Sequence, residues 1–244
     1  MAIRLVLFDA LHTIVTPRLP IYVQYSQTFE PYLGRLDPVQ LRTSFKTALK
    51  QLQAEKPVYV SGAPGWWGEV IKRTALGAGA DTEAVDKSLE EIVPRLLQRF
   101  SSREGYKLFD DTLPTLQHLK KLNIRTGLIS NTDARMRAVL EDLEVLSLLD
   151  PVLLSEEEGV EKPSRELYLR ACTRAGVKPE ETLHVGDEMG ADYYGARASG
   201  ISALLIRRPG PDGEEEMREV GENLDGVETV ASLLDVVHWA ARKS

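Results

Sequence analysis

The chain of 244 residues carries a formal net charge of −7, and 43% of its residues are hydrophobic, which is enough for one or two compact domains with a substantial core. The negative balance disfavours nucleic acid and anionic membranes as partners, because both need a basic face, but it leaves room for a small-molecule substrate, phosphorylated ones included. Cys172 is the single cysteine, so no intrachain disulfide can form. Because the sequence also lacks a signal-peptide pattern and an apolar run of membrane length, we expect a cytoplasmic or nuclear protein.

The first predicted element is a strand over residues 3–8, "IRLVLF", whose unbroken apolar run is typical of a strand buried on both faces of a parallel sheet. Residues 16–105 then contain no convincing strand, and their apolar residues recur at helical spacing. Asp37 and Pro38 predict the start of one helix, and a second helical stretch contains Pro94, which should bend it. The sequence therefore predicts a helical insertion behind the first strand.

From about residue 107 onward, aliphatic runs and helical patterns alternate, which predicts right-handed βαβ units. The predicted strands cover residues 124–129, 151–154, 182–186 and 201–206. The predicted helices cover residues 111–123 with Leu113, Leu116 and Leu119 on one side, 133–143 with Asp133 as cap, and 163–176. A polar surface loop over 207–225 and a closing helix over 227–240 complete the chain. The predicted fold is α/β: a doubly wound, Rossmann-like parallel sheet formed by residues 1–15 and 106–244, with an α-helical cap domain at 16–105.

Residues that carry chemistry follow several of these strands, and the carboxyl ends of parallel strands meet in one crevice. They are Asp9 and Thr13 behind the first strand, Ser130 and Asn131 behind "TGLI", Lys162 in "GVEKP", and Asp187 and Asp192 in "VGDEMGAD". In order and in residue type, these segments resemble the four signature motifs of the haloacid dehalogenase superfamily. The resemblance covers essentially the whole chain, and residues 16–105 resemble the helical cap that follows the first motif in that superfamily.

Within the insertion, the stretch from Phe45 to Thr74 contains the adjacent Trp66 and Trp67. It is similar to the caps of the eukaryotic haloacid dehalogenase-like hydrolase domain-containing subfamily. The two tryptophans, with Tyr22 and Tyr25, are candidates to line a substrate pocket. Aromatic residues in a small helical domain are, however, first of all core residues.

The resemblance implies a role for each motif residue. Asp9 would be the covalent nucleophile, while Asp192 would orient Lys162 or hold a metal-bound water. Thr13 is expected to brace the loop and is a candidate to hydrogen-bond Asp9. Ser130, the neighbouring amide of Asn131 and Lys162 would bind the phosphate or substrate. Mg²⁺ would be held by Asp9, the backbone carbonyl of Leu11 and Asp187. This is the oxygen-rich ligand set that the ion prefers.

Simpler explanations exist for single residues. Asp9 could cap the loop that follows it, Ser130 and Asn131 could form a turn, and Lys162 could be an ordinary surface charge. Cys172 and His184 are expected in the core, the former within a helix and the latter within a strand. The functional interpretation rests on all four motifs occurring in order.

Leu11 departs from the phosphatase pattern of the superfamily, which has a second Asp at this position as general acid and base. The sequence "FDALHT" instead resembles the "FDAYGT" type of the dehalogenases, whose halide leaves without a proton. Their halide-binding Arg has no clear counterpart here, Arg42 being the nearest candidate. His12 could donate a proton near neutral pH, but we expect its side chain to point away from the direction taken by residue 11.

Three functions therefore remain open. The first is a slow or selective Mg²⁺-dependent phosphatase that is weakened by Leu11. The second is a hydrolase of the 2-haloacid dehalogenase type. The third is an inactive member of the fold that only binds.

Overall fold

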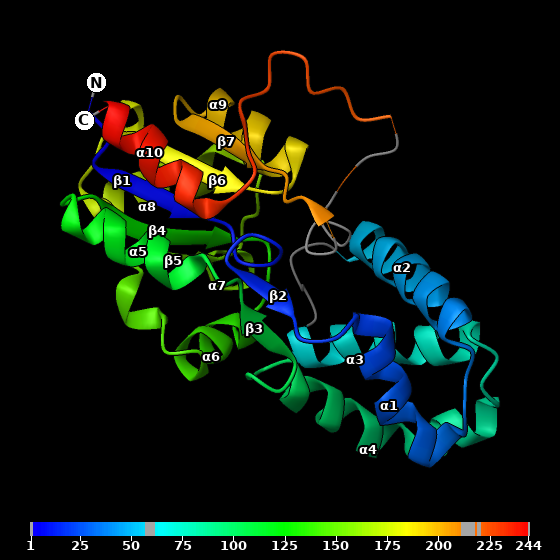
Figure 1. The fold of residues 1–244 in the computed structure, drawn as a ribbon. Helices are drawn as coiled ribbons and strands as arrows, with labels where there is room; N and C mark the ends of the chain where they lie inside the picture. Colours follow the sequence, from blue (N-terminus) through cyan, green and yellow to red (C-terminus); the bar gives the residue numbers. More distant parts are fainter. Residues whose placement is uncertain (1, 57–61, 211–217, 219–220, 244) are drawn as a thin grey trace. The chain divides into compact units, whose positions relative to one another are not determined.

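The structure is a computed structural model that describes residues 2–56, 62–210, 218 and 221–243. Its main sheet has six parallel strands in the order β5-β4-β1-β6-β7-β8, with helices flanking it (Figure 1). The strands are β1 (Leu5–Phe8), β4 (Arg125–Ser130), β5 (Val152–Leu154), β6 (Thr182–Gly186), β7 (Ser202–Ile206) and β8 (Thr229–Val230). The predicted doubly wound α/β fold is confirmed.

The chain divides into two compact units, one formed by Met1–Thr16 and Leu108–Ser244, the other by Pro17–Lys107. It crosses between them at β2 (Val15–Pro17) and β3 (Tyr106–Leu108), which pair in a small second sheet. The predicted boundaries at residues 15 and 105 lie close to these crossings. The two strands were not predicted, because three residues are too few to show an apolar pattern.

The Pro17–Lys107 unit is helical, as expected. Two of its helices begin where an aspartate accepts a backbone amide: Asp37 from Val39 and Asp81 from Ala84. Pro94 lies inside one continuous helix. The helices are α1 (Ile21–Leu33), α2 (Pro38–Glu55), α3 (Ala63–Gly77) and α4 (Thr82–Arg99).

Helices of the other unit cover the main sheet. Leu5 and Leu7, on one face of β1, share a core cluster with Leu167 and Ala171 of α8. The longer helices are α5 (Thr112–Lys121), α6 (Arg135–Asp142), α8 (Arg165–Ala175) and α10 (Leu233–Lys243). The short ones are η2 (Leu146–Leu148), α7 (Ser155–Glu158), η3 (Pro179–Glu181), the π-helical turn η4 (Met189–Tyr194) and α9 (Gly195–Ala198). None of the helices in the described part of the chain is long and apolar enough to cross a membrane.

Several local predictions were wrong. Leu113 is exposed, since only Leu116 and Leu119 of that face reach the core. The helix expected after Asp133 begins at Arg135, although the Asp133 carboxylate still accepts the Arg135 amide. The closing helix begins only at Leu233, because Thr229 and Val230 form the edge strand β8.

The strand order places a topological switch point at β1. From β1 the chain moves outward to β4 and β5, then returns to the opposite side of β1 for β6 and β7. Phe8, the last residue of β1, lies opposite Leu128 on β4 and Val185 on β6. Residues that follow these three strands are therefore neighbours at the edge where open α/β sheets bind ligands.

Gly127→Ala tests how tightly β4 is packed beside β1. A Cβ at Gly127 would lie 2.7 Å from the Pro151 carbonyl oxygen and 2.9 Å from Cδ2 of Leu7. We expect this overpacking to lower the free energy of unfolding by about 1–3 kcal/mol in urea denaturation. In the control Gly68→Ala, on α3, the nearest atoms are 3.9 Å away, and helix propensity should raise stability by up to about 1 kcal/mol. Equal stability of the two variants would contradict the prediction.

Candidate active site

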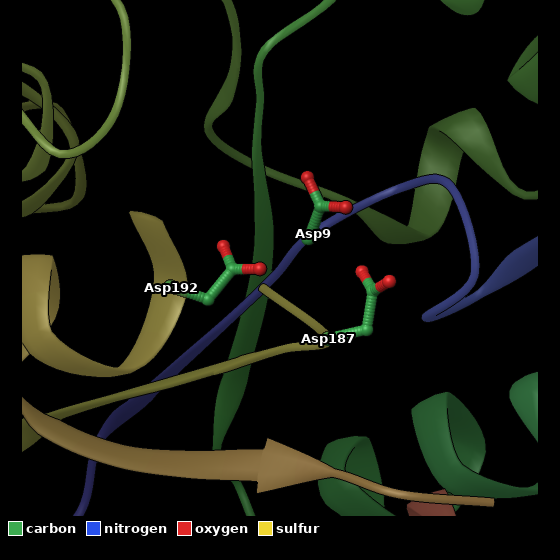
Figure 2. A group of neighbouring side chains, drawn as sticks. All are labelled: Asp9, Asp187 and Asp192. Carbon is green, nitrogen blue, oxygen red and sulfur yellow. The ribbon is translucent and has the colours of Figure 1, made fainter. Parts of the chain in front are cut away.

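Three buried carboxylates gather at the switch point. Asp9 directly follows β1, Asp187 follows β6, and Asp192 lies in η4 (Figure 2). One oxygen of each lies within 4.8 Å of the others, and the three residues are only 1–7% exposed. Three like charges at this spacing repel one another, so the group requires compensating positive charge.

Lys162 supplies one positive charge. Its Nζ donates to Oδ1 of Asp9 and to Oδ1 of Asp192, each at 2.6 Å, and the side chain is buried. Burial alone would lower the pKa of Lys162, but Asp192 and Asp9 outweigh it and raise this pKa well above its ordinary value. The ammonium is therefore charged at neutral pH.

The two carboxylates that share this lysine differ in protonation behaviour. Burial raises the pKa of Asp192, yet Lys162 and His184 outweigh it, and the net pKa lies well below the usual range. For Asp9, burial dominates and the charge of Asp192 adds to it, so its pKa is raised despite Lys162; the Ser130 hydroxyl acts in the opposite, lowering direction. More positive charge near Asp9 would keep it ionised, as a nucleophile must be.

Asn131 holds the backbone of Lys162. Its carboxamide donates to the Lys162 carbonyl oxygen at 2.9 Å and accepts the Lys162 amide at 2.7 Å. Both ends of the side chain are thereby used inside the protein. The side chain therefore positions Lys162, and the binding role expected of the Asn131 backbone amide stays a prediction.

Asp192 is fixed by three donors. Besides Lys162, its Oδ1 lies 2.8 Å from Nε2 of the buried His184, and its Oδ2 accepts the Glu188 amide at 2.9 Å. The expectation that His184 is a core residue is confirmed, but it also contacts the site, which the sequence did not indicate. Glu188 was missed as well: burial, reinforced by Asp192, raises the pKa of its carboxyl to about 7.

The loop behind Asp9 is shaped by its backbone. Leu11 forms an isolated bridge with Val15, and His12 adopts a φ of 58°. Thr13 is fully buried, and its hydroxyl has no hydrogen-bond partner among the described residues, so the expected bond to Asp9 is absent. Burial lowers the pKa of His12 to about 4, which leaves the imidazole uncharged at neutral pH.

Arg208 anchors this loop and was missed from the sequence. Its guanidinium donates to the Thr13 carbonyl at 3.0 Å and to both oxygens of Asp111 at 2.9 and 3.0 Å, and its Cζ lies 3.8 Å from the Phe109 ring centroid. The surface loop predicted over 207–225 is thus buried at Arg208; residues 211–217 and 219–220 lie outside the described part. The position of Arg207 and Arg208 directly after the strand at residues 202–206 was the sequence feature that could have indicated this role.

The aromatic candidates belong to the core of the helical unit. Trp66 is 3% exposed, packs with Leu52 and Val70, and donates its indole N–H to the Lys56 carbonyl at 3.0 Å. Tyr25 is buried in the second cluster of that unit. Trp67 is half-buried and meets Trp66 edge-on. The substrate role expected for Trp66 is not supported by this placement, because its polar group already serves the interior.

The acidic group suits a divalent cation. Mg²⁺ prefers carboxylate and carbonyl oxygens. The three clustered carboxylates and the ammonium that Asp9 and Asp192 share leave a formal charge of −2 for an ion to balance. The oxygens of Asp192 already accept three hydrogen bonds. Asp9 and Asp187 are therefore the side chains that fit such an ion best.

Comparisons with known proteins agree with this geometry. A family model described as haloacid dehalogenase-like hydrolase matches residues 3–200. Haloacid dehalogenase-like hydrolase domain-containing protein 3 of Danio rerio is 29% identical over 84% of this chain and 86% of its own length. Glyceraldehyde 3-phosphate phosphatase of Methanopyrus kandleri is 34% identical over 79% of this chain and 80% of its own length. The 2-haloacid dehalogenase from Pseudomonas syringae shares the fold, with a TM-score of 0.66, 22% identity, and coverage of 99% of this chain and 100% of that one.

His12→Gly tests the electrostatic cost of the loop behind Asp9. The pKa of His12 is about 4 in the folded protein, against an ordinary 6.5. As the pH falls from 6.5 to about 4, the imidazole therefore takes up a proton in the unfolded chain but not in the folded protein. The parent should lose stability relative to the variant by about 1.4 kcal/mol per pH unit within the window, in urea denaturation without divalent metal.

Asn123→Gly is the matched control, since Asn123 has a similar φ of 56° and does not titrate. It should leave the pH slope of the parent unchanged. Parallel slopes of the parent and His12→Gly would show that His12 is not held uncharged.

Proposed function

The chain belongs to the family of haloacid dehalogenase-like hydrolases, and on that basis we propose that it is a Mg²⁺-dependent phosphatase of selective substrate range with Asp9 as nucleophile. The observation that carries the proposal is the buried cluster of Asp9, Asp187 and Asp192, in which Asp9 and Asp192 share the ammonium of Lys162. The similarity to the phosphatase of Methanopyrus kandleri supports the same class of substrate, a small phosphorylated molecule.

Electrostatics favour phosphoryl transfer with a metal ion. The formal charge of −2 left by three carboxylates and one lysine would repel a phosphate dianion at this distance. Mg²⁺ held by Asp9, Asp187 and the Leu11 carbonyl would cancel that charge and stabilise negative charge that develops on the phosphoryl oxygens.

Different residues attack the phosphorus and bind the phosphoryl oxygens in the first step. A carboxylate oxygen of Asp9 attacks phosphorus, the bond to the leaving oxygen breaks, and an aspartyl phosphate results. Lys162, the Ser130 hydroxyl and the Asn131 backbone amide are placed to bind the oxygens of the transferring group. Water then attacks the phosphorus of this ester, which releases inorganic phosphate and restores Asp9.

Leu11 restricts the substrates that this site can hydrolyse. Neither Leu11 nor the uncharged His12 supplies a proton to the leaving oxygen. A phosphate ester whose leaving group is a weak base needs no such proton. We therefore expect aryl and acyl phosphates to be hydrolysed faster than alkyl phosphates, with slow turnover of the aspartyl phosphate.

The helical unit Pro17–Lys107 is proposed to act as the cap of this family, which would select the substrate. Its resemblance to the family's caps and its insertion directly behind the loop of Asp9 support this role. Trp67, which is half-buried, is its remaining aromatic candidate for substrate contact.

Dehalogenation is the second candidate, because the absence of an acid at Leu11 suits a halide leaving group. Chloride release from 2-haloacids without added metal, in the absence of phosphate release from aryl or acyl phosphates with Mg²⁺, would favour it. The binding-only alternative predicts neither product.

Leu11→Asp restores a carboxyl group beside the nucleophile. Turnover of alkyl phosphates should rise by about 10²-fold or more, since a positioned general acid and base contributes that much. Phosphate release measured with Mg²⁺ tests this, and Leu11→Asn, which has the same shape without a transferable proton, should show no gain. An unchanged rate in Leu11→Asp would indicate that Ser130 or Lys162 does not bind the phosphoryl group.

Asp9→Asn removes the attacking oxyanion, so phosphate release should fall below detection and no radioactive phosphate should remain on the protein after acid quench. Asp37→Asn, which replaces one good helix cap by another far along the chain, is the control and should leave activity unchanged. Full activity in Asp9→Asn would rule out the covalent route.

A further inference from the structure

His184 lies directly behind the charged group of the site. It belongs to β6, is fully buried, and its Nε2 lies 2.8 Å from Oδ1 of Asp192. The same oxygen accepts the ammonium of Lys162 at 2.6 Å, and that ammonium also donates to Asp9 at 2.6 Å. An unbroken series of contacts thus runs from His184 to the proposed nucleophile.

The direction of the hydrogen bond follows from its partners. Asp192 accepts donors at both oxygens, from Lys162 and from the Glu188 amide, so its carboxylate is ionised and can only accept. Nε2 of His184 must therefore carry the proton. Nδ1 then bears a lone pair, and it has no partner among the described residues, as a neutral ring in this tautomer allows.

The strand itself is adapted to Asp192. His184 and Gly186 are two residues apart and face the same side of β6. A Cβ at Gly186 would overlap the carboxylate of Asp192, so only glycine admits this close approach. The sequence "HVG" therefore provides a donor and a space for one carboxylate.

We propose that His184 is a positioning residue: by donating to Oδ1 of Asp192 it fixes the carboxylate that directs the Lys162 ammonium toward Asp9. This inference rests on the proposed function for its kinetic consequence, and on the contacts alone for its structural one. Without the imidazole, the carboxylate keeps two donors, and its Oδ1 loses the contact that holds it in line with the Lys162 ammonium. A merely space-filling role would need no N–H at this place.

Two variants separate the effect of the His184 N–H donor from the effect of the side-chain volume. His184→Met fills the space without a donor, while His184→Gln retains an amide N–H that can reach Asp192. In crystal structures, His184→Met should show a rotated Asp192 and a longer Lys162–Asp9 distance, and His184→Gln should keep the parent arrangement. An unmoved Asp192 and Lys162 in His184→Met would overturn the proposal, whether or not the enzyme is active.

The kinetic readout is a split between kcat and KM. With an aryl phosphate and Mg²⁺, His184→Met should lower kcat by about ten- to a hundredfold with little change in KM, as expected for loss of one hydrogen bond to a charged group. His184→Gln should recover most of kcat. Equal loss in both variants would assign His184 a structural role only. A parent without turnover would refute the proposed function, while the crystallographic comparison would still decide the positioning role.

The parent protein provides a test that does not depend on folding of a variant. Nitrogen-15 NMR of histidine-labelled protein should show a proton on Nε2 of His184. An Nε2 without a proton would reverse the inferred hydrogen bond and refute the proposal.

Discussion

The buried ammonium of Lys162, shared between Asp9 and Asp192, is the interaction on which the rest of the site depends. Removing one partner from such a group leaves an uncompensated buried charge, which costs several kcal/mol, about 3–5 in typical cases. The surrounding contacts can be understood as means of keeping it complete. Asn131 holds the lysine backbone, while β6 provides the donor and the space for Asp192.

The second constraint is the backbone behind β1. Arg208 connects the Thr13 carbonyl to Asp111 at the start of α5, and Asp111 also accepts the amide of Leu233 at the start of α10. Arg208 and its partner Asp111 thereby tie the loop behind Asp9 to helices α5 and α10 of the same unit. Because the loop is held through main-chain groups, its side chains can vary without moving Asp9. This explains how a leucine can stand at position 11 in an otherwise complete site.

The sequence predicted the features of this protein that follow from the order and pattern of its strands and helices. Continuous apolar runs identified the central strands, and the rule that parallel strands share a carboxyl edge brought Asp9, Ser130 and Asp187 together. The contacts of individual side chains could not be predicted in the same way. The sequence cannot show that Asn131 turns toward the lysine backbone or that Trp66 donates its N–H inward. The role of Arg208 was missed because a polar, turn-rich stretch is typical of a surface loop. In the structure the Arg208 side chain stacks on Phe109 and is buried.

Position 11 separates two properties that are usually found together in such a site. In the proposed phosphatase, the cation and the phosphoryl oxygens would be bound by charges, amides and a main-chain carbonyl, and all of these groups remain when residue 11 is leucine. Proton transfer depends on the side chain alone, and leucine has no proton to give. The proposed site would keep its affinity for phosphoryl groups, while its rate would depend on the basicity of the leaving group. The loop behind Asp9 would then select substrates by the chemistry of their leaving groups, before any selection by shape.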